Sequence, residues 1–242
     1  MKLNSANINV MVKACRKAAK TLIRDFGEIE KLQVSLKGPG DFVTASDKKA
    51  EKILIEELGK ARPNYSILSE EVGEIKNDEE FKWIIDPIDG TSNFLHGIPH
   101  FAISIGLEHN KEIICGIIYD PIKDEMFTAE KGNGSYLNNQ RMRVSARSKL
   151  KDCIIFTGGP KHGSTSSELS LKEYNKFSSE VLIPIRKLGS ASLDMAYVAA
   201  GRCDGFWQRN LKYWDIAAGI ILVKESGGFV TDFKGEKGYM QN

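Results

Sequence analysis

The segment at residues 83–93 constrains this chain more than any other part of its sequence. It reads Trp-Ile-Ile-Asp-Pro-Ile-Asp-Gly-Thr-Ser-Asn, and its apolar opening is typical of a strand buried on both faces. Because Pro87 has no N–H to donate to a neighbouring strand, we expect the strand to stop there and the chain to turn. Asp86 and Asp89 are then predicted to point into one volume at the carboxyl end of the strand, together with the carbonyl oxygen of Ile88.

Two carboxylates in one volume need a shared proton or a cation. At about 4 Å and an effective dielectric of about 20, they repel each other by roughly 4 kcal/mol. Carboxylates with a carbonyl oxygen are the ligands that a hard cation such as Mg²⁺ prefers. Gly90 and Thr91 follow and are predicted to begin a helix, whose free N–H groups favour an anion. Asp-Pro and Asp-Gly are also ordinary turn formers, so the prediction of a metal and phosphate site depends on the whole segment.

The overall composition is that of an ordinary globular enzyme. The chain has 242 residues, 41% hydrophobic and 27% charged, with a net charge of +2, which allows one large domain or two lobes and gives no support for membrane or nucleic-acid binding. The four cysteines are scattered without a C-x-x-C pair, so we expect reduced thiols in the cytoplasm. The first residues lack the apolar segment of a signal peptide, and no apolar run reaches the roughly 18 residues of a membrane span.

Hydrophobic periodicity predicts two lobes of different architecture. Helical spacing covers residues 4–26 and 46–60, and strand patterns cover 65–68, 101–119 with a turn at 109–111, 125–129 and 134–137. After about Ser145, strands at 153–157, 182–186 and 205–208 alternate with helices at 168–179, 190–200 and 215–225. We therefore predict an α+β lobe with an antiparallel sheet over residues 1–145 and an α/β lobe over residues 146–242.

Other polar residues at element ends extend the predicted site. Glu70 follows the strand at 65–68, where open α/β sheets place their ligands, although a surface acid would look the same. Asp47 and Asp215 each stand at a predicted helix start, where an aspartate is either a cap or a functional carboxylate. Residues 189–191 open another helix and either offer N–H groups to a hydroxylated substrate or form a plain helix start.

The sequence offers no sign of covalent catalysis. The four histidines, His96, His100, His109 and His162, do not form a ligand cluster. There is no Gly-x-Ser-x-Gly motif, and no cysteine pairs recognisably with a histidine. This pattern favours direct attack by a metal-activated water.

Four motifs in order resemble the inositol monophosphatase family, the Mg²⁺-dependent, lithium-sensitive sugar phosphatases. They are Asp-Phe-Val-Thr-Ala-Ser-Asp at 41–47, Ser-Glu-Glu at 69–71, the segment at 83–93, and Trp-Asp-Ile-Ala-Ala-Gly at 214–219 with Glu-Ser-Gly-Gly at 225–228. The similarity runs from near the N-terminus to Asp232 and is greatest to the bacterial branch. It implies a layered αβαβα fold, a homodimer and the hydrolysis of monophosphates similar to inositol 1-phosphate.

The resemblance also implies a set of metal ligands. Glu70, Asp86 and the carbonyl of Ile88 would hold one Mg²⁺, and Asp86, Asp89 and Asp215 would hold a second. A weaker third ion would use Glu70 and water.

The same resemblance implies roles in catalysis and substrate binding. Thr91, paired with Asp47, would orient the attacking water and help to deprotonate it, with Glu70 as a third catalytic residue. The backbone N–H groups of Gly90 and Thr91 would bind the phosphate. The residues implied for the alcohol part of the substrate are Asp89, Gly189, Ser190, Ala191 and Asp215.

The chain departs from the family pattern in two places. Members that use inositol phosphate carry a glutamate at the position of Gln208, where it contacts a substrate hydroxyl. Gln208 lacks the charge, keeps an acceptor and adds a donor, so it bears on the substrate more than on the reaction. Relatives also continue beyond the position of Asn242 with a strand and a helix, so we expect an uncovered sheet edge here.

Two alternatives to inositol-phosphate hydrolysis stay open. A sister enzyme would act on fructose 1,6-bisphosphate, histidinol phosphate or a 3′-phosphonucleotide. A regulatory protein would instead bind the transcription or ribosome-assembly machinery. Its only sequence support is a basic face on the first helix, formed by Lys13, Arg16, Lys17, Lys20 and Arg24.

Overall fold

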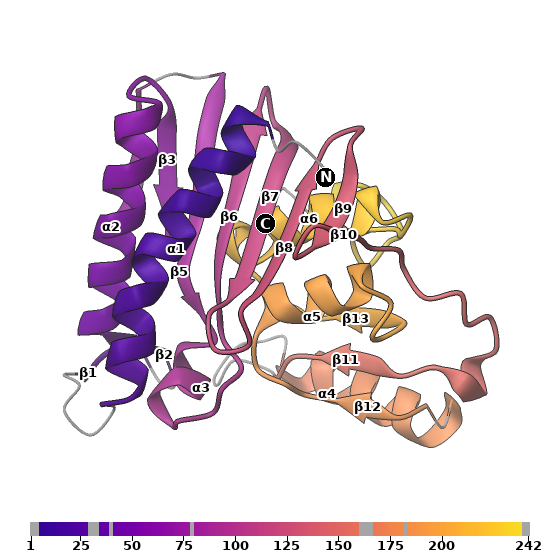
Figure 1. The fold of residues 1–242 in the computed structure, drawn as a ribbon. Coiled ribbons are helices and arrows are strands. Elements are labelled where there is room, and N and C mark those ends of the chain that lie inside the picture. The colour runs from indigo at the N-terminus through magenta and orange to yellow at the C-terminus, as the bar shows by residue number, and fades with distance from the viewer. Residues whose placement is uncertain are drawn as a thin grey trace.

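The protein is built from five alternating layers of helices and sheets (Figure 1). The computed structural model describes residues 5–28, 34–38, 41–77, 80–159, 167–181 and 183–238. An eight-stranded sheet lies between two helix pairs, and a three-stranded sheet lies beyond the second pair. The helices are α1 (Ala6–Phe26) and α2 (Ala45–Ala61) on one face of the large sheet, α5 (Ala191–Ala199) and α6 (Tyr213–Glu225) on the other, and α4 (Ser167–Lys176) outermost. This arrangement confirms the αβαβα fold that the sequence predicted.

The large sheet is antiparallel except at one position. Its strand order is β10-β9-β8-β7-β6-β5-β3-β4, and only β3 and β5 pair in parallel. Its strands are β3 (Ser66–Ser69), β4 (Gly73–Ile75), β5 (Phe81–Asp89), β6 (Ala102–His109), β7 (Glu112–Asp120), β8 (Glu125–Glu130), β9 (Gly134–Leu137) and β10 (Gln140–Arg141). The predicted meander from residue 101 to residue 137 is therefore confirmed, whereas β4 and β10 were not predicted.

Two smaller sheets complete the fold. A hairpin joins β1 (Val34–Gly38) to β2 (Asp41–Thr44). The predicted strands of the C-terminal half form a parallel sheet in the order β12-β11-β13, with β11 (Ile155–Thr157), β12 (Ile185–Arg186) and β13 (Gly205–Trp207). Phe206 of β13 packs towards α5 and α6, and the next side chain, Trp207, stacks on Phe177 just after α4. Since side chains alternate across a strand, α4 covers the opposite face of this sheet.

Helix α1 forms as its sequence pattern predicts, because its first turn is capped and one face is apolar. The hydroxyl of Ser5 accepts a hydrogen bond from the N–H of Ile8 at the helix start. Ile8, Met11, Cys15 and Leu22 recur at helical spacing and are buried against α2 and the sheet. The helix begins at Ala6 rather than at residue 4.

The prediction that β5 ends at Pro87 was wrong. The strand continues to Asp89, and its register against β6 shifts on the way: Asp86 pairs with Ser104, and Asp89 pairs with Ala102. Three steps along β5 thus match two along β6, as in a β-bulge, and pairing with β3 has already stopped at Ile85. Pro87 is tolerated because, with the shifted register, its missing N–H is not needed for a hydrogen bond to a neighbouring strand.

The register shift brings the two aspartates onto one face of the sheet. On a regular strand, residues three apart point to opposite faces. Ser104 and Ala102 are two apart on β6 and share a face, so their partners Asp86 and Asp89 share it too. The hydroxyl of Ser104 lies 3.5 Å from the carbonyl oxygen of Trp214 in α6, which identifies this as the α6 side.

Helix α6 lies unusually close to the sheet. A Cβ added at Gly106 would be 2.9 Å from the Cβ of Ala217, and one added at Gly116 would be 2.8 Å from the carbonyl oxygen of Ala218. Neither strand position therefore has room for a side chain. The close contact sets how deep the first turn of α6 reaches towards the strand ends.

The two predicted lobes share their interior. Ile84 of β5 and Phe127 of β8 lie in one apolar cluster with Leu193 of α5 and Ile221 of α6. The division at residues 145 and 146 stays a prediction. Among the described residues, no helix combines the length and the apolar character needed to cross a membrane.

Candidate active site

The site lies where β5 ends and the short helix α3 (Thr91–Leu95) begins, at the lower end of the large sheet in Figure 1. Gly90 precedes α3 with a φ of 97°, in the left-handed region that favours glycine. A Cβ at this position would also be 3.1 Å from the carbonyl oxygen of His100 and 3.2 Å from that of Gly189. The predicted helix start at Gly90 is confirmed, and the turn accepts only glycine without strain.

Asp47 combines a capping role with a contact to Thr91. One carboxylate oxygen accepts from the N–H of Thr44 at 2.8 Å and from the Thr44 hydroxyl, which closes a capping box at the start of α2. The other oxygen lies 3.2 Å from the hydroxyl of Thr91. Burial raises the pKa of Asp47 to about 6, although the hydrogen bonds from Thr44 oppose the shift. The capping role of Asp47 is confirmed, and its role as a functional carboxylate stays a prediction.

The hydroxyl of Thr91 stands between two acceptors. It lies 3.0 Å from the carbonyl oxygen of Ile88 as well as 3.2 Å from Asp47. A threonine hydroxyl has one proton, so it donates to one of these acceptors at a time and keeps lone pairs for a further donor. The N–H of Ile88 donates to Asp86 at 3.0 Å, which fixes the end of β5 around the buried aspartate.

Asp89 joins the two halves of the chain. Its Oδ2 atom accepts from the hydroxyl of Ser190 at 2.6 Å, the N–H of Ser192 at 2.6 Å and the hydroxyl of Ser192 at 2.5 Å. Ser190 is the N-cap of α5, so the predicted helix start at residues 189–191 is confirmed. Burial raises the pKa of Asp89, and the hydrogen bonds from Ser190 and Ser192 oppose that rise.

Asp86 is the centre of a cluster of acids. Its side chain is 1% exposed. Burial first, and then the negative charges of Glu70, Asp89, Asp215 and Asp47, hold its pKa well above the usual value. The structure thus brings together all the carboxylates that the sequence singled out. One buried carboxylate with four acidic neighbours needs protons or a cation.

Glu70 and Asp215 reach this cluster from two other elements. Glu70 follows β3 directly, as predicted, and its N–H donates to the carbonyl of Ile85 at 3.3 Å. The prediction that Asp215 begins its helix was wrong, because α6 starts at Tyr213. Oδ2 of Asp215 accepts a hydrogen bond from the N–H of Lys212 at 2.6 Å. An aspartate in the third helical position caps in this way, so the helix starts two residues earlier.

Two of the carboxylates, Asp89 and Asp215, already accept hydrogen bonds from protein donors. Within the parts of the chain that the structure describes, no group of three or more histidine, cysteine, aspartate or glutamate side chains is closed tightly enough to hold a metal ion as it stands. Their chemistry nevertheless fits a hard cation, because each is an oxygen donor and their mutual repulsion is uncompensated at Asp86.

Gln208 lies in the wall of a cavity. It follows β13 and lines a cavity of about 790 Å³ together with Trp207, Met195 and Ile216, and none of the predicted metal ligands lines that cavity among the described residues. Its side chain lies so close to Gly158 that a Cβ there would overlap it. Gln208 thus stays a predicted substrate residue.

Three residues at the site were not predicted. Ser192 and Glu51 are buried and bind site elements through hydrogen bonds. Asn93 donates at 2.8 Å both to the carbonyl of His100 and to that of Leu188, which ties α3 to the segment before α5. Glu51 had a usable signal, since it stands four residues after Asp47 on the same helix face.

Clustered carboxylates at the end of a bulged strand, beside a helix start that favours an anion, fit a metal-dependent phosphatase. The chain belongs to the inositol monophosphatase family, whose family model matches residues 4–242. It is accordingly a phosphomonoesterase.

Known relatives agree in sequence and in structure. The chain is 55% identical to the inositol-1-monophosphatase of Rhizobium meliloti, over 96% of this chain and 87% of that protein. It is similar to the crystal structure of extragenic suppressor protein suhB from Bartonella henselae, with a TM-score of 0.94, 53% identity, and coverage of 98% of this chain and 91% of that one. It is also 41% identical to the Nus factor SuhB of Escherichia coli, over 96% of this chain and 87% of that protein.

Proposed function

We propose that this chain is a Mg²⁺-dependent phosphatase of inositol 1-phosphate and similar monophosphates of polyhydric alcohols. The observation that carries the proposal is the buried carboxylate of Asp86 among four acidic neighbours, next to the start of α3. The substrate class is supported by relatives at 55% and 52% identity that are named inositol-1-monophosphatase.

The proposed ligands for two Mg²⁺ ions are oxygen atoms of the site. Glu70, Asp86 and the carbonyl of Ile88 would hold one ion, and Asp86, Asp89 and Asp215 the other, with a weaker third ion at Glu70. Oδ2 of Asp89 already accepts hydrogen bonds from Ser190 and Ser192, so Oδ1 is its proposed ligand atom. When bound, Mg²⁺ supplies positive charge that lowers the pKa of water and offsets the charge of the phosphate.

Thr91 and Asp47 would prepare the attacking water. The hydroxyl of Thr91 accepts a hydrogen bond from the water and donates its own proton towards Asp47, whose pKa of about 6 leaves it mostly ionised at neutral pH. Water attacks phosphorus and its proton passes through Thr91 towards Asp47, while the ester oxygen leaves as an alkoxide with the electron pair of the broken bond and takes a proton from solvent to become the alcohol.

The proposed substrate contacts surround this pair. The N–H groups of Gly90 and Thr91 would bind phosphate oxygens. The proposed contacts to the alcohol are Asp89, Gly189, Ser190, Ala191, Gln208 and Asp215.

Phosphate release from a substrate panel tests the proposal. The panel is inositol 1-phosphate, fructose 1,6-bisphosphate, 3′-phosphoadenosine 5′-phosphate and histidinol phosphate, each with Mg²⁺ and with a chelator. We expect Mg²⁺-dependent release that is fastest with inositol 1-phosphate; faster release from another member would assign that sister activity instead. Asp86→Asn should abolish release with the fold intact, and Asp152→Asn, at an exposed position in the short 3₁₀ helix Leu150–Asp152, should not. Near-normal turnover by Asp86→Asn would overturn the metal assignment.

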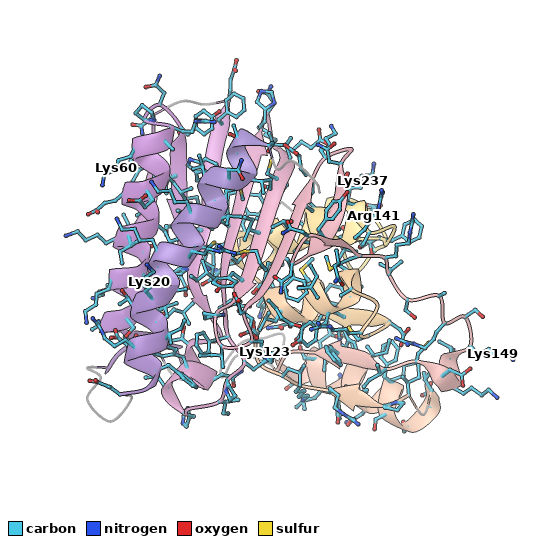
Figure 2. All side chains as sticks on the ribbon, viewed as in Figure 1. Lys20, Lys60, Lys123, Arg141, Lys149 and Lys237 are labelled. Carbon is cyan, nitrogen blue, oxygen red and sulfur yellow. The ribbon has the colours of Figure 1, made fainter. Side chains whose placement is uncertain are left out.

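A regulatory role is the second candidate, because some relatives are named Nus factor SuhB. Two lysines of the basic face on α1 are already paired within the protein, since Lys13 and Lys17 form ion pairs with Glu57. Lys20 lies on the outer side of α1 (Figure 2). Reversing Lys13, Arg16 and Lys20 to glutamate should abolish binding to the transcription machinery while hydrolysis continues. Absence of such binding by the unmodified chain would remove this candidate.

Three further properties belong to the same proposal. We expect a homodimer in sedimentation, inhibition by Li⁺ at fixed Mg²⁺, and a cytoplasmic location in cell fractionation. A monomer, full activity in Li⁺, or recovery with the membrane fraction would each contradict one of them.

A further inference from the structure

Helix α2 presents two buried acids to the site, one helical turn apart. Asp47 and Glu51 are four residues apart and therefore lie on one face of the helix. Asp47 contacts Thr91, as described above. Glu51 is 2% exposed and contacts a different part of the site.

Within the described parts of the chain, Glu51 accepts its hydrogen bonds from the last residue of β3 and from the turn that follows. Its Oε1 atom accepts from the hydroxyl of Ser69, from the N–H of Glu71 at 3.0 Å and from the N–H of Val72 at 3.2 Å. These three donors flank Glu70 on both sides. A single buried oxygen therefore fixes the backbone that carries a proposed metal ligand.

The environment of Glu51 differs from that of another buried acid on the same helix. Glu57 pairs with the ammonium groups of Lys13 at 3.0 Å and Lys17 at 2.7 Å at the surface of α1. Glu51 is instead satisfied by a hydroxyl and two backbone N–H groups. A buried carboxylate is stable only when hydrogen-bond donors compensate its lost hydration. The donors beside Glu70 therefore stabilise the Glu51 carboxylate, and the carboxylate in turn fixes the position of those donors.

We propose that Glu51 is a positioning residue for metal binding. It holds the turn after β3 so that the carboxylate of Glu70 is already placed when Mg²⁺ arrives, while Asp47 holds Thr91 from the same helix. The inference rests on the proposed function, because it takes Glu70 as a metal ligand.

Mg²⁺ binding without substrate is the first test, measured as Mg²⁺-dependent thermal stabilisation and by calorimetry. Residues that support a metal ligand typically change affinity by about 10- to 100-fold when removed, and we expect a loss of that size for Glu51→Ala. Glu51→Gln keeps an acceptor oxygen at the same place and should recover most of the affinity. The matched control is Glu57→Gln, which should lose stability and keep its Mg²⁺ affinity.

Amide hydrogen exchange of the metal-free protein is the second test. The N–H groups of Glu71 and Val72 should exchange faster in Glu51→Ala and near the native rate in Glu51→Gln. If Glu51→Ala does not fold, Ser69→Ala removes one of the three donors and should move both readouts in the same direction.

Each outcome decides between the inference and the proposed function. Unchanged Mg²⁺ affinity or unchanged exchange in Glu51→Ala, in a chain that hydrolyses phosphate esters, would overturn the inference alone. The same holds if Glu57→Gln loses as much affinity as Glu51→Ala. A native chain that binds Mg²⁺ and releases no phosphate would overturn the proposed function and leave the role of Glu51 standing.

Discussion

The contact between α6 and the sheet predicts a large effect for the smallest possible substitution, Gly116→Ala. The added Cβ would lie 2.8 Å from the carbonyl oxygen and 3.0 Å from the Cα of Ala218, and 2.5 Å from a methyl of Ile221. Ordinary contacts of carbon are about 3.5–4.0 Å, so the helix has to retreat by about 0.5–1 Å. Overpacking of this kind costs about 1–3 kcal/mol. At roughly 2–4 °C per kcal/mol for a chain of this size, the melting temperature should fall by about 2 to 12 °C.

Thermal unfolding of the metal-free protein measures this effect, and Gly59→Ala is its control. Gly59 lies within α2 with no atom near its added Cβ, so the same substitution should stabilise the protein by about 0.5–1 kcal/mol. Because Asp215 stands in the first turn of α6, Gly116→Ala should also weaken Mg²⁺ binding, whereas Gly59→Ala should not. An unchanged or raised melting temperature for Gly116→Ala would refute the reasoning.

Three other substitutions test single side chains. Burial, and then the charge of Asp89, raises the pKa of Asp194 to about 8, so native stability should fall between about pH 4 and pH 8 by roughly 1.4 kcal/mol per pH unit from this group alone. Asp194→Asn removes this pH-dependent loss of stability. In urea unfolding, the free energy of unfolding of the variant, relative to that of the native chain, should therefore be higher at pH 8 than at pH 5. An equal difference between the two proteins at both pH values would contradict this. Ser192→Ala removes one donor to Oδ2 of Asp89, a proposed metal ligand, and the loss of such a supporting partner typically lowers metal affinity by about 10- to 100-fold, which calorimetry should show. Gln208→Glu should raise kcat/KM for inositol 1-phosphate, and an unchanged value would show that this position does not set specificity.

Those parts of the fold that depend on local patterns were predictable from the sequence. The apolar stripe of α1, the meander through β6 and β7, and the helix start after Gly90 follow from periodicity and turn chemistry. The short strands β4 and β10 were missed because strands of three and two residues exist only through pairing with a longer neighbour.

Two local rules failed where another part of the chain overrode them. Proline usually ends a strand, but a register shift against β6 lets β5 pass through Pro87. A helix-start aspartate is usually the cap, but Asp215 caps from the third position through the N–H of Lys212. In both cases the outcome depends on the position of a backbone group, in β6 or at Lys212, that the local sequence pattern does not specify.

The carboxylates of the candidate site were predictable from the sequence, but the hydrogen bonds that hold them in place were not. Asp47, Glu70 and Asp86 were each recognisable from motif and element ends. Glu51 bonds to Glu71 beside Glu70, and Ser192 bonds to Asp89; these partners are 20 and 103 positions apart in the chain, so no local pattern relates them. The resemblance to a family supplied the roles, and the structure supplied the hydrogen bonds behind them.

The register shift in β5 makes the site sensitive to the number of residues between Asp86 and Asp89, in addition to the identity of the two carboxylates. Deleting one residue between Asp86 and Asp89 would let the strand pair regularly with β6 and would leave both carboxylates in the sequence. The strand would be better formed than before, yet Asp89 could no longer meet both Asp86 and the start of α5. An insertion or deletion between the two aspartates would therefore disrupt the site even though every proposed carboxylate is still present.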